Sequence, residues 1–177
     1  MMLRWVFVIF SLPGTAPASR VPPCSVMELR QSPGYRWSTE RIAQMVDSAS
    51  QIVRARAISA DSLVQTVTFE PLEWIRGAKA NAVSLALYGI AVDRDDLNDS
   101  PVPYQMVRPA GQRGDCFARE YRLGAQYLLL LQDRPRSNTI QWWPLAPVNE
   151  QLRGEDDPWL AWVRERAARR SPLRGDN

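Results

Sequence analysis

The sequence contains no histidine and only one lysine among its 177 residues. Because histidine is the commonest general base and metal ligand near neutral pH, its absence excludes an ordinary histidine-centred catalytic triad. The two cysteines, Cys24 and Cys116, are too few to build a thiolate zinc site. The chain also lacks a phosphate-binding loop, a G-x-S-x-G nucleophile elbow and a G-x-G-x-x-G dinucleotide motif. We therefore expect no metal, no cofactor and no catalytic residues of these kinds.

Long apolar runs are also scarce. The run from Trp5 to Phe10 follows Arg4 and precedes Ala16-Pro17-Ala18, a succession typical of a secretory signal peptide cleaved after Ala18. The run is too short to cross a bilayer of about 30 Å as a helix, so we expect no stable membrane insertion after cleavage. Residues 1–18 are then the signal peptide, and the protein is secreted or periplasmic. The alternative is that the run forms a short buried strand.

The composition is that of an ordinary globular protein, with 45% hydrophobic and 23% charged residues. A chain of this length fits one domain, which we place at residues 19–170, followed by a disordered tail at 171–177. Nearly all the positive charge is arginine, but the net charge is only +3, and we expect no DNA partner.

The periodicity of the apolar residues predicts a mainly β protein with flanking helices. Spacings of three and four predict a short amphipathic helix over 38–47, with Ser38 or Thr39 as its N-cap. Asp157 followed by Pro158 predicts the start of a second helix that ends near Arg170. Alternation predicts strands at 52–58, 63–74, 82–88 and 139–143, with a turn at 59–62 between the first two. The continuous apolar run from Tyr127 to Leu131 predicts a central strand buried on both faces.

The segment from Ala91 to Arg113 has no periodicity and is rich in acids. Its carboxylates suggest a calcium loop, but an EF-hand that begins at Asp93 would need a glycine at Asn98 and a glutamate at Tyr104. A solvated acidic loop is the preferred interpretation. A hydrolase that uses two carboxylates is an alternative, and no spacing selects a pair from the available acids. Those acids are Asp93, Asp95, Asp96, Asp99 and Glu120.

Aromatic and basic residues suggest a possible binding face. Trp142 and Trp143 would project from opposite faces of a strand, so one is expected in the core while the other can stack on a sugar or a base. Together with Arg54 and Arg56 they would suit a single-stranded nucleic acid, which is a further alternative. Packing is the simpler interpretation of these tryptophans.

One set of residues resembles a known family. A cysteine shortly after the signal peptide, strands that end at 73–77, and Gly114-Asp115-Cys116 followed by Gly124 and the apolar strand at 127–131 resemble the netrin-like modules. That group includes the tissue inhibitors of metalloproteinases and their bacterial relatives. The resemblance implies an OB-type five-stranded antiparallel barrel and a disulfide between the two cysteines. Those inhibitors carry more disulfides and chelate zinc through an N-terminal cysteine, whereas Cys24 lies five residues beyond Ser19.

The expected function is that of a secreted, non-catalytic binding module, which recognises a protein or a polymer of the cell envelope or the extracellular space. Long loops on barrels commonly carry recognition, and the possible ligand-binding residues are Trp142, Trp143, Arg54, Arg56, Asp95 and Asp96. In an oxidising compartment, two cysteines without metal partners normally form a disulfide, here between Cys24 and Cys116. Free buried thiols are the alternative if residues 1–18 are not a signal peptide.

Overall fold

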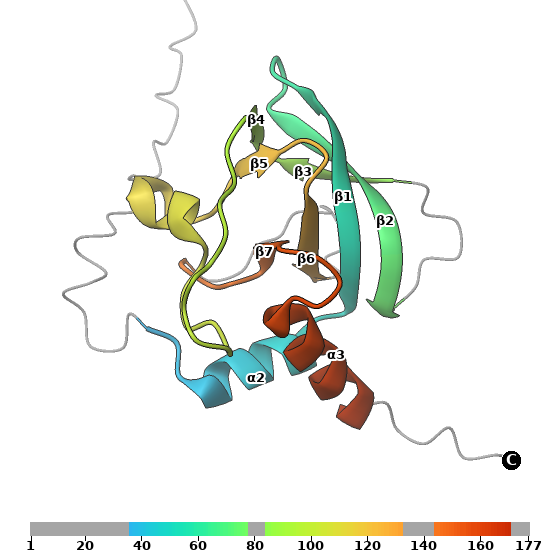
Figure 1. Ribbon diagram of the computed structural model, residues 1–177, viewed down its shortest axis with the longest axis vertical. Coiled ribbons are helices and arrows are strands. Elements are labelled where there is room, and N and C mark those ends of the chain that lie inside the picture. The colour runs from blue at the N-terminus through green and yellow to red at the C-terminus, as the bar shows by residue number, and fades with distance from the viewer. Residues whose placement is uncertain (1–35, 78–83, 133–143, 171–177) are drawn as a thin grey trace, which may run out of the picture.

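The computed structural model describes residues 36–77, 84–132 and 144–170, and these form a mainly β structure with a five-stranded antiparallel sheet and two helices (Figure 1). The order of the sheet is β3-β2-β1-β6-β7, and a separate parallel pair joins β4 to β5. The helices are α2 (Thr39–Ser48) and α3 (Pro158–Arg170). The strands are β1 (Gln51–Asp61), β2 (Thr66–Arg76), β3 (Leu85–Tyr88), β4 (Ile90–Val92), β5 (Glu120–Arg122), β6 (Gln126–Leu131) and β7 (Asn149–Leu152).

Strands β1 and β2 form the long hairpin that the alternation predicted. Val53, Ala55 and Ala57 point into the core, and Arg56 and Ile58 are exposed, as period two requires. The turn lies at 62–65, three residues later than predicted, because the Asp61 side chain accepts a hydrogen bond from the backbone N–H of Leu63 at 2.9 Å and holds that bend.

The prediction that the 127–131 strand is central and buried on both faces is confirmed. Strand β6 lies between β1 and β7, and its side chains enter two separate apolar clusters. Leu128 and Leu130 pack with the helices, whereas Tyr127 and Leu129 pack with Phe69 on the other side. A strand covered on both faces explains why the sequence here is continuously apolar and does not alternate.

The sheet is not closed into a barrel. Its edge strands are β3 and β7, and the chain that leaves β3 turns away at Gly89 into β4, which pairs in parallel with β5. A Cβ at Gly89 would lie 2.5 Å from the carbonyl oxygen of Arg119, so only glycine permits this close approach. Further on, Leu97 forms an isolated parallel bridge with Gln151 of β7.

Both helices form where the sequence predicted them. The Ser38 side chain caps α2 by accepting from the N–H of Arg41, and Asp157 caps α3 by accepting from the N–H of Trp159 at 2.9 Å. Helices α2 and α3 lie together at one end of the molecule, where Arg166 of α3 forms an ion pair with Asp47 at 2.6 Å (Figure 1). They bury Ile42, Met45, Val46, Trp159 and Val163 in one cluster.

Some predictions concern parts of the chain that the structure does not describe. The signal peptide, the predicted strand at 139–143 and the tail at 171–177 lie outside the described residues. Strand β7 was not predicted at all, because its sequence, Asn-Glu-Gln-Leu, is polar although every residue in it is buried.

Candidate functional site

A buried polar network fixes the long loop that follows β4. Arg108 is fully buried and its guanidinium donates to the Asp96 carboxylate at 2.5 Å, to the Asn149 carbonyl at 2.9 Å and to the Glu120 carbonyl at 2.7 Å. The Asp96 carboxylate also accepts from the backbone N–H of Ala110 at 2.9 Å. The charged groups of Arg108 and Asp96 therefore both have hydrogen-bond partners, which burial in a low-dielectric core requires.

The interpretation of 91–113 as a solvated acidic loop is wrong for its central part. Asp96 and Asn98 are buried, with only 4% and 2% of their surface exposed, whereas Asp93, Asp95 and Asp99 are exposed. Arg108, twelve residues after Asp96, carries a positive charge that is buried inside the protein. Asp96 is buried with it because its carboxylate neutralises that charge.

Glu150 of β7 is the second buried acid of this network. Its carboxylate accepts from the side-chain amide of Asn98 at 2.9 Å and from the backbone N–H of Arg108 at 3.0 Å. Burial raises the pKa of Glu150 to about 7, and this outweighs the opposing effects of Asn98 and of the Arg108 charge. Through these two hydrogen bonds the Glu150 side chain links the loop to β7.

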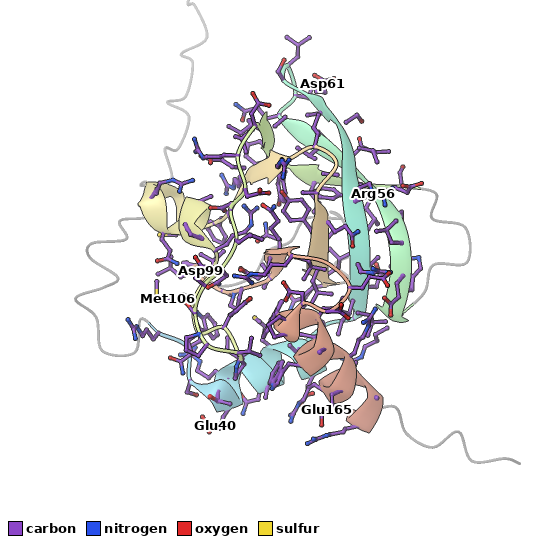
Figure 2. All side chains as sticks on the ribbon, in the orientation of Figure 1. Glu40, Arg56, Asp61, Asp99, Met106 and Glu165 are labelled. Carbon is purple, nitrogen blue, oxygen red and sulfur yellow. The ribbon has the colours of Figure 1, made fainter. Side chains whose placement is uncertain are left out.

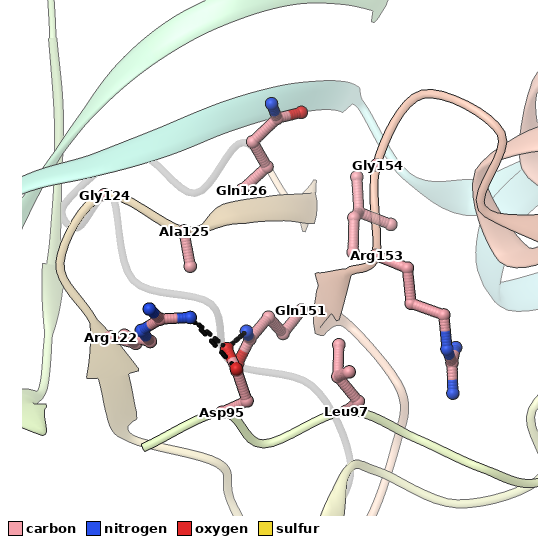
Figure 3. Close-up of a pocket in the computed structure, with 10 residues that line it drawn as sticks. Asp95, Leu97, Arg122, Gly124, Ala125, Gln126, Gln151, Arg153 and Gly154 are labelled. Atoms are coloured by element: carbon pink, nitrogen blue, oxygen red, sulfur yellow. Dashed lines mark hydrogen bonds and ion pairs between the residues drawn. The ribbon is translucent and has the colours of Figure 1, made fainter. Parts of the chain in front are cut away.

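A pocket of about 320 Å³ lies beside Asp95 and Gln151 (Figure 3). The loop contributes Asp95 and Leu97, and the other walls come from β5, β6 and β7, from the turn between β5 and β6, and from the two residues that follow β7. The lining residues are Asp95, Leu97, Arg122, Gly124, Ala125, Gln126, Gln151, Leu152, Arg153 and Gly154. The volume is at the lower limit for small-molecule sites, which are usually about 300–1,000 Å³.

The polar groups of the pocket are held by one another. Arg122 donates two hydrogen bonds to Asp95, at 2.7 and 2.9 Å, and the Gln151 amide donates to the same carboxylate (Figure 3). Arg122 and then Gln151 lower the pKa of Asp95, so this carboxylate stays ionised at neutral pH. The side-chain oxygen Oε1 of Gln151 accepts from the buried backbone N–H of Asp96 at 2.8 Å, which connects the pocket to the network.

The structure separates the two acids that the sequence placed side by side. Asp95 faces the pocket, whereas Asp96 points inward to Arg108. Asp95 is the only carboxylate among the lining residues, and it is ionised and paired with arginine. A two-carboxylate hydrolase needs an acid that remains protonated and a second carboxylate beside it, so this arrangement does not favour that chemistry.

The predicted arginines lie on β1, and each is paired with an acid. Arg54 is 11% exposed and lies between Glu73 at 3.2 Å and Glu155 at 2.8 Å. Arg56 is exposed and faces Glu70 at 3.7 Å. Neutralised arginines offer little to a phosphate backbone, so they do not favour nucleic-acid binding. Trp142 and Trp143 lie outside the described residues.

Cys116 is fully buried in a cluster with Met106, Val107 and Leu145. Its predicted partner Cys24 lies outside the described residues, so the Cys24–Cys116 disulfide stays a prediction.

A second surface was missed by the sequence analysis: the exposed large hydrophobic side chains gather at one end of the molecule. Within the described residues they are Ile58, Leu63, Val64, Tyr88, Ile90 and Leu123. Backbone hydrogen bonds bring their segments together: the N–H of Gly89 donates to Gln65 at 2.8 Å, and that of Gly124 to Ala57 at 2.7 Å. We call this surface the apolar end.

The apolar end lies opposite the helices. Figure 2 shows Asp61 of the β1–β2 hairpin at one extremity, and Glu40 of α2 and Glu165 of α3 at the other. Leu63 and Val64 gave a sequence signal for this surface, because two apolar residues follow the turn residue Asp61. The alternation there also fits a strand, and the sequence analysis assigned both residues to a strand.

Comparisons with known proteins give no identification. No protein-family model, no curated protein and no solved structure matches this chain. Across the three described ranges, no helix combines the length and apolarity needed to cross a membrane, and no group of three or more acids or cysteines is placed to hold a metal ion.

Proposed function

We propose that this protein is an exported, non-catalytic binding module that recognises a protein partner through its apolar end. The observation that carries the proposal is the gathering of exposed hydrophobic side chains at the strand ends opposite the helices. Leu63 is 93% exposed and Val64 63% exposed at the tip of the β1–β2 hairpin. Exposed apolar groups that lie together mark interaction surfaces more often than groups scattered singly.

The charges nearby favour a protein over a nucleic acid or an anionic bilayer. Four arginines in this part of the molecule form ion pairs with three acids: Arg56 with Glu70 at 3.7 Å, Arg94 and Arg113 with Glu120 at 2.5 and 2.9 Å, and Arg122 with Asp95 at 2.7 Å. Apolar and tyrosine side chains with polar groups near them are the usual composition of a protein interface. A polyanion is bound through arginines and lysines that are available to its phosphates, and arginines already paired with acids are less available.

The experiment is site-specific photo-crosslinking in the producing organism's envelope and culture fluid. A photoreactive residue replaces Leu63, and the matched control carries it at Glu165, whose side chain is 62% exposed on α3 at the opposite end. We expect one discrete protein adduct from position 63 and none from position 165. Leu63→Asp should abolish binding of the purified partner because burying a carboxylate in an apolar contact is costly.

The other occupants are measured in parallel. Self-association by sedimentation analysis would assign the surface to a second copy of this chain, and co-sedimentation with vesicles of phosphatidylglycerol and phosphatidylethanolamine would assign it to a membrane. Either result, or adducts of equal yield from positions 63 and 165, overturns the proposal of a protein partner.

We further propose an OB-type barrel of the netrin-like kind. Support comes from the single parallel bridge between Leu97 and Gln151, because it links the chain leaving β3 to β7 and so brings the two edges of the sheet toward closure. Export is part of the same proposal, and N-terminal sequencing of the exported protein should begin at Ser19. A crystal structure in which no further pairing joins these edges would contradict the barrel.

A further inference from the structure

We propose that the pocket beside Asp95 and Gln151 binds one unit of an uncharged carbohydrate. This inference does not depend on the apolar end, because none of the exposed hydrophobic residues of that surface lines the pocket, although the Arg122–Asp95 ion pair belongs to the surroundings of both. It adds a second ligand class to the module.

The first argument is the set of side chains that the pocket offers. Its polar walls consist of a carboxylate, two carboxamides and two guanidiniums, from Asp95, Gln126, Gln151, Arg122 and Arg153. All are planar groups with donors or acceptors in pairs. Neighbouring hydroxyl groups on a sugar ring both donate and accept, and paired groups on one plane match two such hydroxyls at once.

The second argument is charge. Asp95 neutralises Arg122, and Arg153 is turned toward the Asp99 carboxylate at 2.6 Å and the Asn98 carbonyl at 2.9 Å. A phosphate or carboxylate ligand would have to compete with these acids for the guanidiniums. A metal ion would find one carboxylate, already paired. The balance therefore suits a ligand without formal charge.

The third argument is shape. Gly124 and Gly154 line the pocket, and no atom lies within 4 Å of the position that a Cβ would occupy on either residue. No side chain therefore covers the backbone at these two points of the lining, and a ligand can approach it closely. A volume of about 320 Å³ equals that of about ten water molecules, which is enough for one sugar ring.

The described lining offers no stacking surface. No aromatic side chain is among the described residues of the pocket wall, so a ligand there would not be held by stacking, on which base recognition mainly depends. Hydrogen bonding to planar side chains that are already fixed remains the means of recognition. Gln151 is fixed on both sides, by Asp96 and by Asp95, so little side-chain entropy is lost when a ligand binds.

The test begins with an array of uncharged oligosaccharides of glucose, mannose, galactose and N-acetylglucosamine. The best ligand is then titrated into ¹⁵N-labelled exported protein while the side-chain amide signals of Gln126 and Gln151 are followed by NMR. We expect saturable shifts of both signals, with a dissociation constant that stays the same between 50 mM and 500 mM NaCl because no charge is involved.

Two variants and one control locate the binding. Gly154→Val adds a branched side chain to a residue that lines the pocket and should weaken binding at least tenfold, and Gln126→Ala should weaken it about fivefold, the worth of one neutral hydrogen bond. Arg169→Ala, on the exposed side of α3, should change nothing. Unfolding midpoints of all variants verify that they are folded.

Three results would overturn the inference: no uncharged oligosaccharide binds, only inorganic phosphate binds, or Gly154→Val leaves the affinity unchanged. Leu63→Asp should leave sugar binding intact. If sugar binding holds and the crosslink at position 63 fails, only the proposed protein partner is refuted. If the crosslink holds and sugar binding fails, only the carbohydrate site is refuted.

Discussion

Replacing Glu150 with glutamine should remove most of the pH dependence of stability between pH 5 and pH 8. The pKa of Glu150 is raised from 4.5 to about 7 in the folded protein, because burial disfavours its charged form. The folded state therefore holds a proton that the unfolded state releases. This contribution to stability is fully present below pH 4.5 and is lost as the pH rises through about 7.

The magnitude follows from the interval between the two pKa values. At about 1.4 kcal/mol per unit, raising the pKa from 4.5 to about 7 corresponds to about 3 kcal/mol of unfolding free energy. The groups that face Glu150 are Asn98, Arg108 and Asp96. Because the chain contains no histidine, no unperturbed side chain titrates in the same window. The α-amino group does titrate there, but it is present in the unsubstituted protein and in Glu150→Gln, so it does not affect the difference between them.

Urea unfolding at pH 5, 6, 7 and 8 provides the measurement. The unfolding free energy of the unsubstituted protein should fall by about 2.5 kcal/mol across this range, and that of Glu150→Gln should be nearly flat. The two proteins are compared by the slope of unfolding free energy against pH and not by its absolute value, because the glutamine amide also changes the hydrogen bond to Asn98. If the unsubstituted protein is equally stable at pH 5 and pH 8, Glu150 is ionised in the fold and the reasoning fails.

Two further predictions concern the cysteines and the buried ion pair. Cys24→Ser and Cys116→Ser should each lower the melting temperature, with the double variant no worse than either, since closing a loop of about 90 residues contributes about 4 kcal/mol; two titratable thiols in the exported, denatured protein would refute the bond. Arg108→Met leaves the Asp96 carboxylate buried without its partner and should cost about 3–5 kcal/mol by urea unfolding, and adding Asp96→Asn should recover part of this loss. Additive costs of the two substitutions would show that the pair is not coupled.

Capping residues and apolar runs were sufficient to predict both helices and the strand at 127–131 from the sequence. The cap residues Ser38 and Asp157 marked the starts of the helices, and the apolar run at 127–131 marked the central strand. Strand β7 had no such signal, because buried polar side chains look like a surface loop in the sequence. Glu150 can be buried only because Asn98 and Arg108 are folded over it, some forty to fifty residues earlier in the chain.

Only part of the candidate site could be predicted from the sequence, because its other residues come from distant segments of the chain. Asp95 and Asp96 were chosen together as acids, yet the side-chain direction that separates them depends on Arg108 and Gln151, which no spacing connects to them. The apolar end depends on three turns meeting in space, and each turn alone shows at most two exposed apolar residues. Charge pairing and burial across distant segments, which decide both surfaces, cannot be inferred from periodicity.

The position of the two helices makes their end of the molecule a suitable point of attachment. Helix α2 follows the first described residues, α3 ends with the last of them, and the Asp47–Arg166 pair holds the two side by side, opposite the β1–β2 hairpin. A tether joined to α3 would therefore orient the hairpin tip and its neighbouring turns away from the surface to which the tether is fixed. Immobilising the protein through α3 should present every copy in the same orientation, with Leu63 outermost, whereas attachment at the hairpin would bury the surface to be measured.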